Sequence, residues 1–311
     1  MVKPFRFGVQ CGGDHDRAGW QQLTRKIEAL GYDTMYVPDH FIDTQMAPVV
    51  AMAVAAEATR TLRVGALVFD NDYKHPAILA KEIATLDRLS DGRVELGIGA
   101  GWLKTDYDAL GLPYDRPGVR VDRLEEALAV IKGAWTGEAF SFEGTHYTIS
   151  DYTALPTPTQ QPHPPILVGG GAPRVLRLAG READIVGINP SLRAGALSGE
   201  QATDSIAEMI DQKVAWIREG AGARFDDIEL QIRYFFAAIT DDRRGLAEAV
   251  APGFGLEPDA VLEAGLTCVG TVEEICDQLV ARRERWGVSC VVFGDDNFEA
   301  FAPVVERLAG T

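Results

Sequence analysis

Short β-branched segments alternate with amphipathic segments of helix length along almost all of the 311 residues, and this alternation constrains the fold most strongly. Apolar residues repeated at a period of two predict strands, whereas apolar residues at a helical period predict helices. Alternating strands and helices are typical of βαβ units, whose strands run parallel in one sheet. Eight such units predict one (β/α)8 TIM barrel domain spanning residues 1–311. The alternative is a doubly wound open sheet, which usually has fewer strands.

Each predicted unit consists of one strand and a following helix. The predicted strands are Phe5–Gln10, Thr34–Val37, Leu62–Phe69, Val94–Ile98, Ile166–Val168, Ile185–Ile188, Glu229–Ile239 and Ser289–Phe293. The predicted helices are Arg17–Leu30, Pro48–Thr59, Pro76–Leu89, Arg120–Trp135, Ala172–Arg181, Gln201–Glu219, Thr271–Trp286 and Phe298–Leu308. Thr271 and Glu274 have the spacing of a capping box, which marks a helix start.

Two segments exceed a minimal barrel. Residues Glu138–Tyr152 predict a β-hairpin, and the proline-rich loop Pro156–Pro165 follows it. Together they form an insertion between strands 4 and 5. Residues Asp241–Gly270 form a long connection before strand 8, with at least one short helix. Connections of this length usually carry function or cover a site.

Charge and hydropathy exclude several classes of partner. Lys and Arg number 30 against 46 Asp and Glu, and the net charge of −16 argues against binding of nucleic acid or of anionic membranes. The apolar runs are shorter than a membrane span, and Met1–Phe7 shows no secretory signal. The spacing of the cysteines fits neither a metal site nor a set of disulfide bonds; they are Cys11, Cys268, Cys276 and Cys290. We therefore expect a cytoplasmic protein with reduced thiols.

The residues that follow each strand define the predicted site, because TIM barrels carry their active sites at the C-terminal ends of the strands. After the fifth strand, the sequence Gly169-Gly170-Gly171-Ala172 leads into a helix that starts near Pro173. Glycines let a ligand approach the backbone, and the free N–H groups of a helix start favour a phosphate. The alternative is that the glycines only form a tight turn.

Two other strand ends carry side chains suited to a heterocyclic ligand. Asp39 and His40 follow the second strand, where they could bind a ring edge or move a proton. A helix cap or a loop hydrogen bond is the alternative role. After the fourth strand, Gly99-Ala100-Gly101 leaves room for a flat ring that Trp102 could border, unless Trp102 packs under the following loop.

The sequence lacks the groups of several other reaction classes. The five histidines have no HxH or HExxH spacing, so no metal site is predicted. A Gly-x-Ser-x-Gly turn for a serine nucleophile is also missing, as is a lysine at a strand end. We therefore expect a phosphate-bearing organic cofactor to supply the chemistry.

Four motifs in this order resemble the bacterial luciferase-like monooxygenase superfamily, and more closely its deazaflavin-dependent branch, which uses coenzyme F-420. The motifs are Val37-Pro38-Asp39-His40, the Gly97–Trp102 turn with its continuation to Tyr114, Pro164–Gly171, and Ala183-Asp184. The resemblance covers nearly the whole chain and includes the insertion between strands 4 and 5.

The resemblance implies a homodimeric TIM barrel with the cofactor ring at its C-terminal mouth. It implies that Asp39 and His40 lie near the ring, with His40 as the catalytic proton donor or acceptor. It further implies a non-prolyl cis peptide near Leu67 and Val68 that supports one ring face. The residues implied to hold the phosphate are Gly169, Gly170, Gly171 and Ala172. Those at the fourth-strand turn beside the ring are Gly99, Ala100, Gly101 and Trp102.

One residue departs from the pattern of a characterised member of this branch. The sugar-phosphate dehydrogenase has an acidic glutamate at the position of Trp102, so oxidation of glucose 6-phosphate is not supported. The predicted function is hydride transfer between coenzyme F-420 and an unidentified small organic substrate. The alternatives are a monooxygenase that uses FMN, oxygen and a partner reductase, or a non-catalytic flavin-binding relative. The cations nearest the active face in sequence, as candidates for the charged cofactor tail, are Arg174, Arg177, Arg193 and Lys74.

Overall fold

A computed structural model describes residues 3–41, 46–195 and 200–311 of the chain. Its central strands are β1 (Arg6–Gln10), β2 (Thr34–Val37), β3 (Arg63–Ala66), β4 (Phe69–Asp70), β5 (Val94–Gly99), β8 (Ile166–Gly170), β9 (Ile185–Ile188), β10 (Glu229–Arg233) and β13 (Val288–Gly294). The peripheral strands are β6 (Phe140–Glu143), β7 (Thr148–Tyr152), β11 (Phe236–Ile239) and β12 (Thr267–Gly270).

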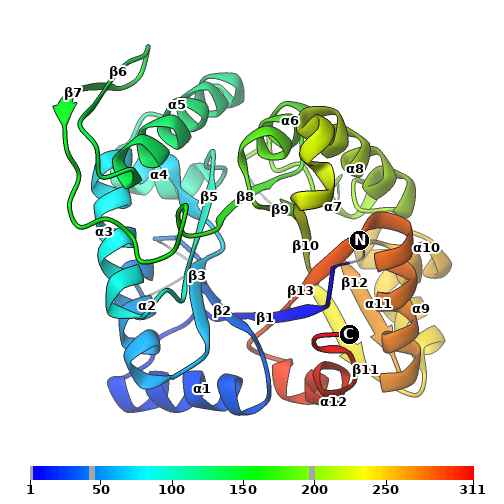
Figure 1. Cartoon of the computed structure of the whole chain (residues 1–311). Coiled ribbons are helices and arrows are strands. Elements are labelled where there is room, and N and C mark those ends of the chain that lie inside the picture. Colours follow the sequence, from blue (N-terminus) through cyan, green and yellow to red (C-terminus); the bar gives the residue numbers. More distant parts are fainter. Residues whose placement is uncertain (1–2, 42–45, 196–199) are drawn as a thin grey trace.

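Helices cover the outside of the central strands (Figure 1). They are α1 (Arg17–Ala29), α2 (Pro48–Ala58), α3 (Pro76–Leu89), α4 (Lys104–Leu110), α5 (Pro117–Trp135), α6 (Pro173–Glu182), α7 (Glu200–Thr203), α8 (Ala207–Ala221), α9 (Arg243–Phe254), α10 (Pro258–Glu263), α11 (Val272–Trp286) and α12 (Phe298–Leu308). The predicted capping box is present at the start of α11, where Thr271 and Glu274 exchange hydrogen bonds.

The central strands form a closed barrel. Their hydrogen-bonded order is β3-β2-β1-β13-β10-β9-β8-β5-β4, and an additional pairing of β3 with β5 closes the ring. Gly65 lies opposite Glu95 across this closing pair, which is parallel like its neighbours. The predicted (β/α)8 TIM barrel is therefore confirmed as a closed barrel of 8 parallel strands.

The interior of the barrel is packed around Tyr36. Its ring belongs to a cluster of buried residues from several strands, with Leu167, Ile185, Cys290 and Val292. A Cβ atom added at Gly8 would lie 2.8 Å from Cε2 of Tyr36, so a glycine is needed there for the ring to fit.

Charged residues close the N-terminal end of the barrel. Glu95 is 1% exposed, and its Oε1 accepts hydrogen bonds from Arg6 Nη1 and Arg63 Nε, both at 2.8 Å. Its other oxygen accepts a bond of 2.7 Å from the Tyr36 hydroxyl. Arg6 also pairs with Glu229 at 2.6 Å, so the network joins strands on opposite sides of the barrel. Because all these groups are paired, their burial is compensated.

The third predicted strand, Leu62–Phe69, is divided in the structure. Strand β3 ends at Ala66, and β4 begins at Phe69 after a cis peptide bond between Leu67 and Val68. The cis peptide agrees with the expectation from the family resemblance. The Leu67 carbonyl accepts a hydrogen bond of 2.8 Å from Gln10 Nε2 instead of continuing the sheet.

The seventh predicted strand, Glu229–Ile239, is also two strands. Strand β10 stays in the barrel, whereas β11 leaves it and pairs with β12 in a parallel two-stranded sheet. The change occurs at Tyr234 and Phe235, whose N–H groups bind the carbonyls of Val292 and Leu266 respectively. The long connection contains the two helices α9 and α10 and the strand β12. The prediction of at least one short helix is therefore confirmed, and the strand was not predicted.

Helix boundaries differ from the prediction in two places. Helix α4 lies in a segment for which no helix was predicted, and it ends at Gly111 in a left-handed conformation with φ of 68°. The predicted helix Gln201–Glu219 is interrupted, because α7 ends before Asp204 and α8 begins at Ala207.

The predicted hairpin is present between β5 and β8, the fourth and fifth strands of the prediction. Its strands β6 and β7 pair antiparallel and project from the barrel (Figure 1). Over the described ranges, no helix is both long and apolar enough to cross a membrane.

Candidate active site

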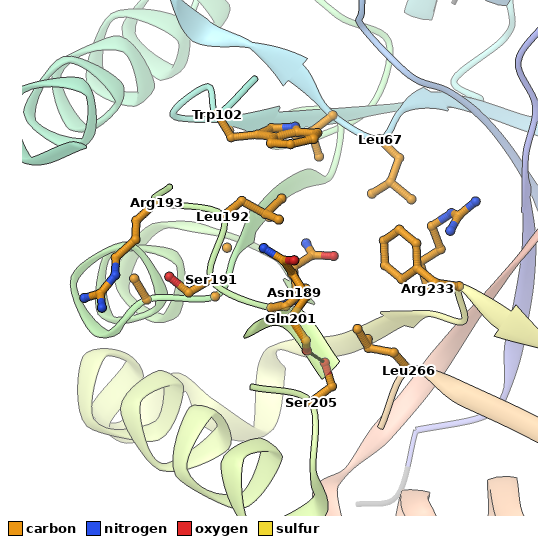
Figure 2. Close-up of a pocket in the computed structure, with 18 of the residues that line it drawn as sticks. Leu67, Trp102, Asn189, Ser191, Leu192, Arg193, Gln201, Ser205, Arg233 and Leu266 are labelled. Atoms are coloured by element: carbon orange, nitrogen blue, oxygen red, sulfur yellow. Dashed lines mark hydrogen bonds between the residues drawn. The ribbon is translucent and has the colours of Figure 1, made fainter. Parts of the chain in front are cut away.

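A cavity of about 850 Å³ opens at the C-terminal ends of the barrel strands. All the site residues predicted from the sequence line it, although they come from segments far apart in the chain. These are Asp39, His40, Leu67, Val68, Gly99, Ala100, Gly101, Trp102, Gly169, Gly170, Gly171 and Ala172. Figure 2 shows Trp102 on one wall and Asn189, Ser191 and Leu192 on another, with open space between them. This is the location expected for the active site of a TIM barrel.

The glycine turn connects β8 to α6 on one wall of the cavity. Gly170 ends the strand, Ala172 is the N-cap of α6, and Pro173 is its first residue. The N–H groups of the first helical turn have no intrahelical acceptor, an arrangement that favours an anion. None of the three glycines has a positive φ. Gly170 and Gly171 are needed for close packing, since a Cβ atom would lie 2.5 Å from Val175 Cγ1 at Gly170 and 2.4 Å from the carbonyl carbon of Pro190 at Gly171.

A buried lysine anchors the loop opposite this turn. Lys213 Nζ donates to the carbonyl of Asn189 at 3.0 Å and to the carboxylate of Asp204 at 2.7 Å. The same Asp204 carboxylate accepts a hydrogen bond of 2.6 Å from the Ser191 N–H. Because Asp204 makes these contacts, residues 189–191 are held beside the start of α6. Asp204 lies in the break between α7 and α8.

His40 is oriented by a carboxylate that the sequence analysis did not assign. Its Nδ1 lies 2.7 Å from Oδ2 of Asp106, which is 0% exposed. Asp106 is itself fixed by the Phe41 N–H at 3.2 Å and the Tyr73 hydroxyl at 3.3 Å. With Nδ1 held by Asp106, Nε2 is the nitrogen left for a ligand in the cavity. The Trp102 ring contacts His40 edge to face, with 5.5 Å between centroids.

Two further carboxyl groups lie beside His40. Burial raises the pKa of Asp39 to about 6, against the opposing effect of a 3.1 Å hydrogen bond from the Asp70 N–H. Burial likewise raises the pKa of Asp70 to about 7, although the Tyr107 hydroxyl donates to its oxygens at 3.0 and 3.1 Å. Both groups therefore keep a proton at higher pH than an ordinary carboxyl group. Asp70 lines the cavity but was not among the predicted site residues.

The turn after β5 is shaped around Asp70. Gly101 has φ of +74°, and an added Cβ would lie 1.9 Å from the Tyr107 hydroxyl and 2.5 Å from an Asp70 oxygen. Only glycine fits there, so the backbone lies close to the buried carboxyl group. The Trp102 carbonyl accepts a hydrogen bond of 2.8 Å from Tyr114, which fixes the position of the tryptophan.

The sequence analysis also missed the most buried cation of the cavity. Arg120 is 2% exposed and lies 4.1 Å above the centre of the Tyr114 ring. It donates to the Asp115 carbonyl at 2.9 Å, but its Nε has no hydrogen-bond partner in the described part of the chain. Arg120 occurs in an ordinary helical pattern, and nothing in the sequence distinguishes it from a solvated arginine.

Three of the four cations considered for a charged ligand lie away from the cavity. Arg174 pairs with Asp122, Arg177 with Glu219, and Lys74 with Glu82. The two arginines pair with acids on neighbouring helices, and Lys74, just before α3, pairs with an acid of that helix, which is the usual role of surface arginine and lysine. Arg193 is the member of the four that lines the cavity. Within residues 3–41, 46–195 and 200–311, no group of histidine, cysteine or acidic side chains is arranged to hold a metal ion.

Comparison with known proteins gives several matches. A family model described as luciferase-like monooxygenase matches residues 2–251. The FMNH(2)-dependent dimethylsulfone monooxygenase of Pseudomonas putida is 31% identical over 283 residues, which are 84% of this chain and 73% of that protein. The F420-dependent glucose-6-phosphate dehydrogenase of Nakamurella multipartita is 29% identical over 297 residues, which are 92% of this chain and 84% of that protein.

Solved structures match over almost the whole chain. The coenzyme F420 dependent tetrahydromethanopterin reductase from Methanopyrus kandleri superimposes with a TM-score of 0.77 at 20% identity. The match covers 98% of this chain and 99% of that one. At this level of identity the likeness shows the shared fold.

Proposed function

We propose that this chain, which belongs to the luciferase-like monooxygenase family, binds coenzyme F-420 and transfers a hydride between this cofactor and a small organic substrate. One observation carries the proposal. A single cavity of about 850 Å³ combines the glycine turn at the start of α6 with the His40 and Asp106 pair. When bound, a deazaflavin supplies a ring carbon that accepts or gives up a hydride. Relatives described as F420-dependent dehydrogenases support this choice of cofactor.

The cavity walls fit a phosphate-bearing cofactor. The N–H groups at the start of α6 suit the phosphate, and the buried Arg120 Nε lacks the partner that a second anionic oxygen would provide. Arg193, beside the same wall, is placed to interact with further negative charge. The side chains of Leu67 and Val68 would pack against a flat ring, because both line the same cavity as His40. We propose these roles for the predicted site residues.

His40 is proposed to move the proton that accompanies the hydride. Reduction of a carbonyl group needs a proton on the oxygen, and oxidation of an alcohol needs a base that removes one. Asp106 accepts the hydrogen of Nδ1, so Nε2 is left to hold or accept this proton. Asp39 and Asp70 line the same cavity, and burial raises the pKa values of their carboxyl groups to about 6 and about 7.

A flavin-dependent monooxygenase is the second candidate, favoured by the 31% identity to the dimethylsulfone monooxygenase. The same glycine turn would bind the FMN phosphate. Such an enzyme would require a partner reductase and oxygen, whereas the deazaflavin enzyme requires neither.

An anaerobic assay separates the two candidates. The protein is mixed with reduced coenzyme F-420 and a panel of aldehydes, ketones and imines in the absence of oxygen. We expect reoxidation of the deazaflavin by at least one compound, with one equivalent of reduced product for each equivalent of cofactor. Turnover that occurs only with reduced FMN and oxygen, and that incorporates oxygen into the product, would favour the monooxygenase.

The glycine turn gives a prediction about affinity. The substitution Gly169→Ala is expected to weaken binding of coenzyme F-420 about tenfold, or ~1.4 kcal/mol. The added methyl group would lie 3.4 Å from both Val68 Cγ1 and Asn189 Nδ2, so it fits the fold but takes up space in the cavity. Gly170 is less suitable for this test, because a Cβ there would lie 2.5 Å from Val175 Cγ1. Fluorescence titration measures the affinity.

The matched control for this prediction is Arg174→Gln, which alters the same helix outside the cavity. Arg174 pairs with Asp122 on α5, so this variant should bind the cofactor like the parent protein. Equal affinity of the parent and the Gly169→Ala variant would show that the cofactor lies elsewhere.

A further inference from the structure

Arg233 is a cation that lines one end of the cavity. It ends β10, whose alternate residues Glu229, Gln231 and Arg233 face the barrel interior. Its Nε is buried and has no hydrogen-bond partner, and Arg233 forms no ion pair within the described ranges. Arg233 is half-buried, and the hydration that its buried Nε has lost is not compensated by a hydrogen bond. A ligand with an anionic group would provide the missing partner.

The charged groups nearest Arg233 do not satisfy it. Burial lowers the pKa of Arg233, while the nearby charges of Asp296 and Asp295 oppose this effect. One Asp295 oxygen is already bound by the Gly12 N–H at 3.0 Å. The Arg233 guanidinium instead lies 4.2 Å from the centre of the Phe235 ring, an interaction that leaves its N–H groups available.

The surface around Arg233 is apolar. The segment that follows β10 and the long connection contribute one wall of the cavity, with Phe235, Phe236, Phe254, Leu256, Val261 and Leu266. Phe236 and Phe254 pack edge to face, with 5.8 Å between ring centroids. Phe235 is 56% exposed, which is unusual for a large apolar side chain and leaves its surface free for a ligand.

Arg233 and Arg193 lie at opposite ends of the cavity. Figure 2 shows Asn189 and Leu192 between the two arginines, with Arg233 near Leu67 and Leu266. The glycine turn at the start of α6 packs against Pro190, since a Cβ at Gly171 would lie 2.4 Å from the Pro190 carbonyl carbon. Figure 2 shows the next residue, Ser191, on the Arg193 side and away from Arg233. A cofactor whose phosphate occupies the glycine turn would therefore leave Arg233 for another molecule.

We propose that Arg233 and the apolar wall form the substrate subsite, and that the substrate is a carboxylate with an apolar, preferably aromatic, body. The carboxylate is bound by the guanidinium in a bidentate manner, and the body packs on Phe235, Phe236 and Leu266. This assignment of the substrate class rests on the proposed function. The binding step itself involves only residues of this chain and can be measured without turnover.

Calorimetric titration of benzoate, phenylacetate and 3-phenylpropanoate tests the proposal, with the primary amide of each acid as its neutral counterpart. The protein is used both free and saturated with coenzyme F-420. We expect at least one acid to bind tenfold or more tightly than its amide in both forms. In Arg233→Met, whose side chain is uncharged, this preference should disappear. In Arg233→Lys, which keeps the charge, part of it should remain.

The control is Arg174→Met, which removes an exposed arginine outside the cavity and should leave the preference unchanged. Equal binding of every acid and its amide would overturn the proposal, as would an unchanged preference in a folded Arg233→Met variant. Loss of acid binding on saturation with coenzyme F-420 would also overturn it, because the acid would then occupy the cofactor site. Failure of coenzyme F-420 to bind, with acid binding retained at Arg233, would instead refute the proposed function alone.

Discussion

Replacing His40 by alanine is expected to lower the rate of hydride transfer at least about 100-fold, because general acid or base catalysis typically contributes that much. The rate is measured in a single turnover with reduced coenzyme F-420 and the compound that reoxidises it in the anaerobic assay. Affinity for the cofactor should stay within about twofold, since Nε2 is assigned to the reacting proton and not to the phosphate. The contact with Trp102 holds the ring in place but supplies no proton.

Asp106→Asn is the companion variant. An asparagine can still accept a hydrogen bond from Nδ1, so the imidazole stays oriented, but the buried negative charge is lost. The rate should therefore fall less than in His40→Ala, and its pH dependence should shift. If rate and cofactor affinity fall together in His40→Ala, then His40 serves binding and not proton transfer.

Glu95→Gln is expected to lower the free energy of unfolding by about 3–5 kcal/mol, the usual cost of breaking a buried ion pair on one side. The variant leaves Arg6 and Arg63 without their shared carboxylate at the strand pair that closes the barrel. Urea unfolding at neutral pH measures the loss. The control is Glu125→Gln, whose carboxylate pairs with Arg181 at the surface and is half exposed. It should cost at most about 1 kcal/mol.

The same carboxylate predicts a dependence on pH. Burial alone would raise the pKa of Glu95, but the nearby charges of Arg6 and Arg63 lower it to about 2. A group whose pKa is depressed by folding stabilises the protein above its unfolded pKa, and this stabilisation is lost as pH falls toward the folded value. The difference between the parent protein and Glu95→Gln should therefore be constant above pH ~4.5 and shrink below it. An equal cost for Glu95→Gln and Glu125→Gln would contradict the account of the barrel closure.

The elements of the barrel could be predicted because each is defined by local periodicity. The predicted site residues line one cavity for the same reason: strand ends of a parallel barrel converge, so the order of strands is enough to bring Asp39, Trp102 and Gly169 together. The division of two predicted strands could not be predicted. Strand-forming residues continue past each break, as Val68 and Phe69 after Leu67 and as Phe235 and Phe236 after Tyr234, so the sequence pattern does not show where the backbone leaves the sheet.

The partners of the charged side chains in the site could not be predicted from local sequence patterns either. Asp106 and His40 are 66 positions apart, and Arg120 and Arg233 have the spacing of ordinary helix and strand residues. Whether such an arginine is paired depends on tertiary neighbours. Arg174 and Arg177 follow the glycine turn in sequence, but the helix turns them toward acids on neighbouring helices. Proximity in the sequence was therefore a poor guide to which cations reach the cavity.

Parallel fluorescence titration of the apoprotein with coenzyme F-420 and with FMN, at low and at high salt, tests the central claim most directly. We expect tighter binding of coenzyme F-420, because Arg193 lines the cavity and its charge would attract the charged tail, which FMN does not have. This advantage should shrink as salt screens the additional charges. Tight binding of FMN without measurable binding of coenzyme F-420 would contradict the account, and the flavin-dependent monooxygenase would take its place.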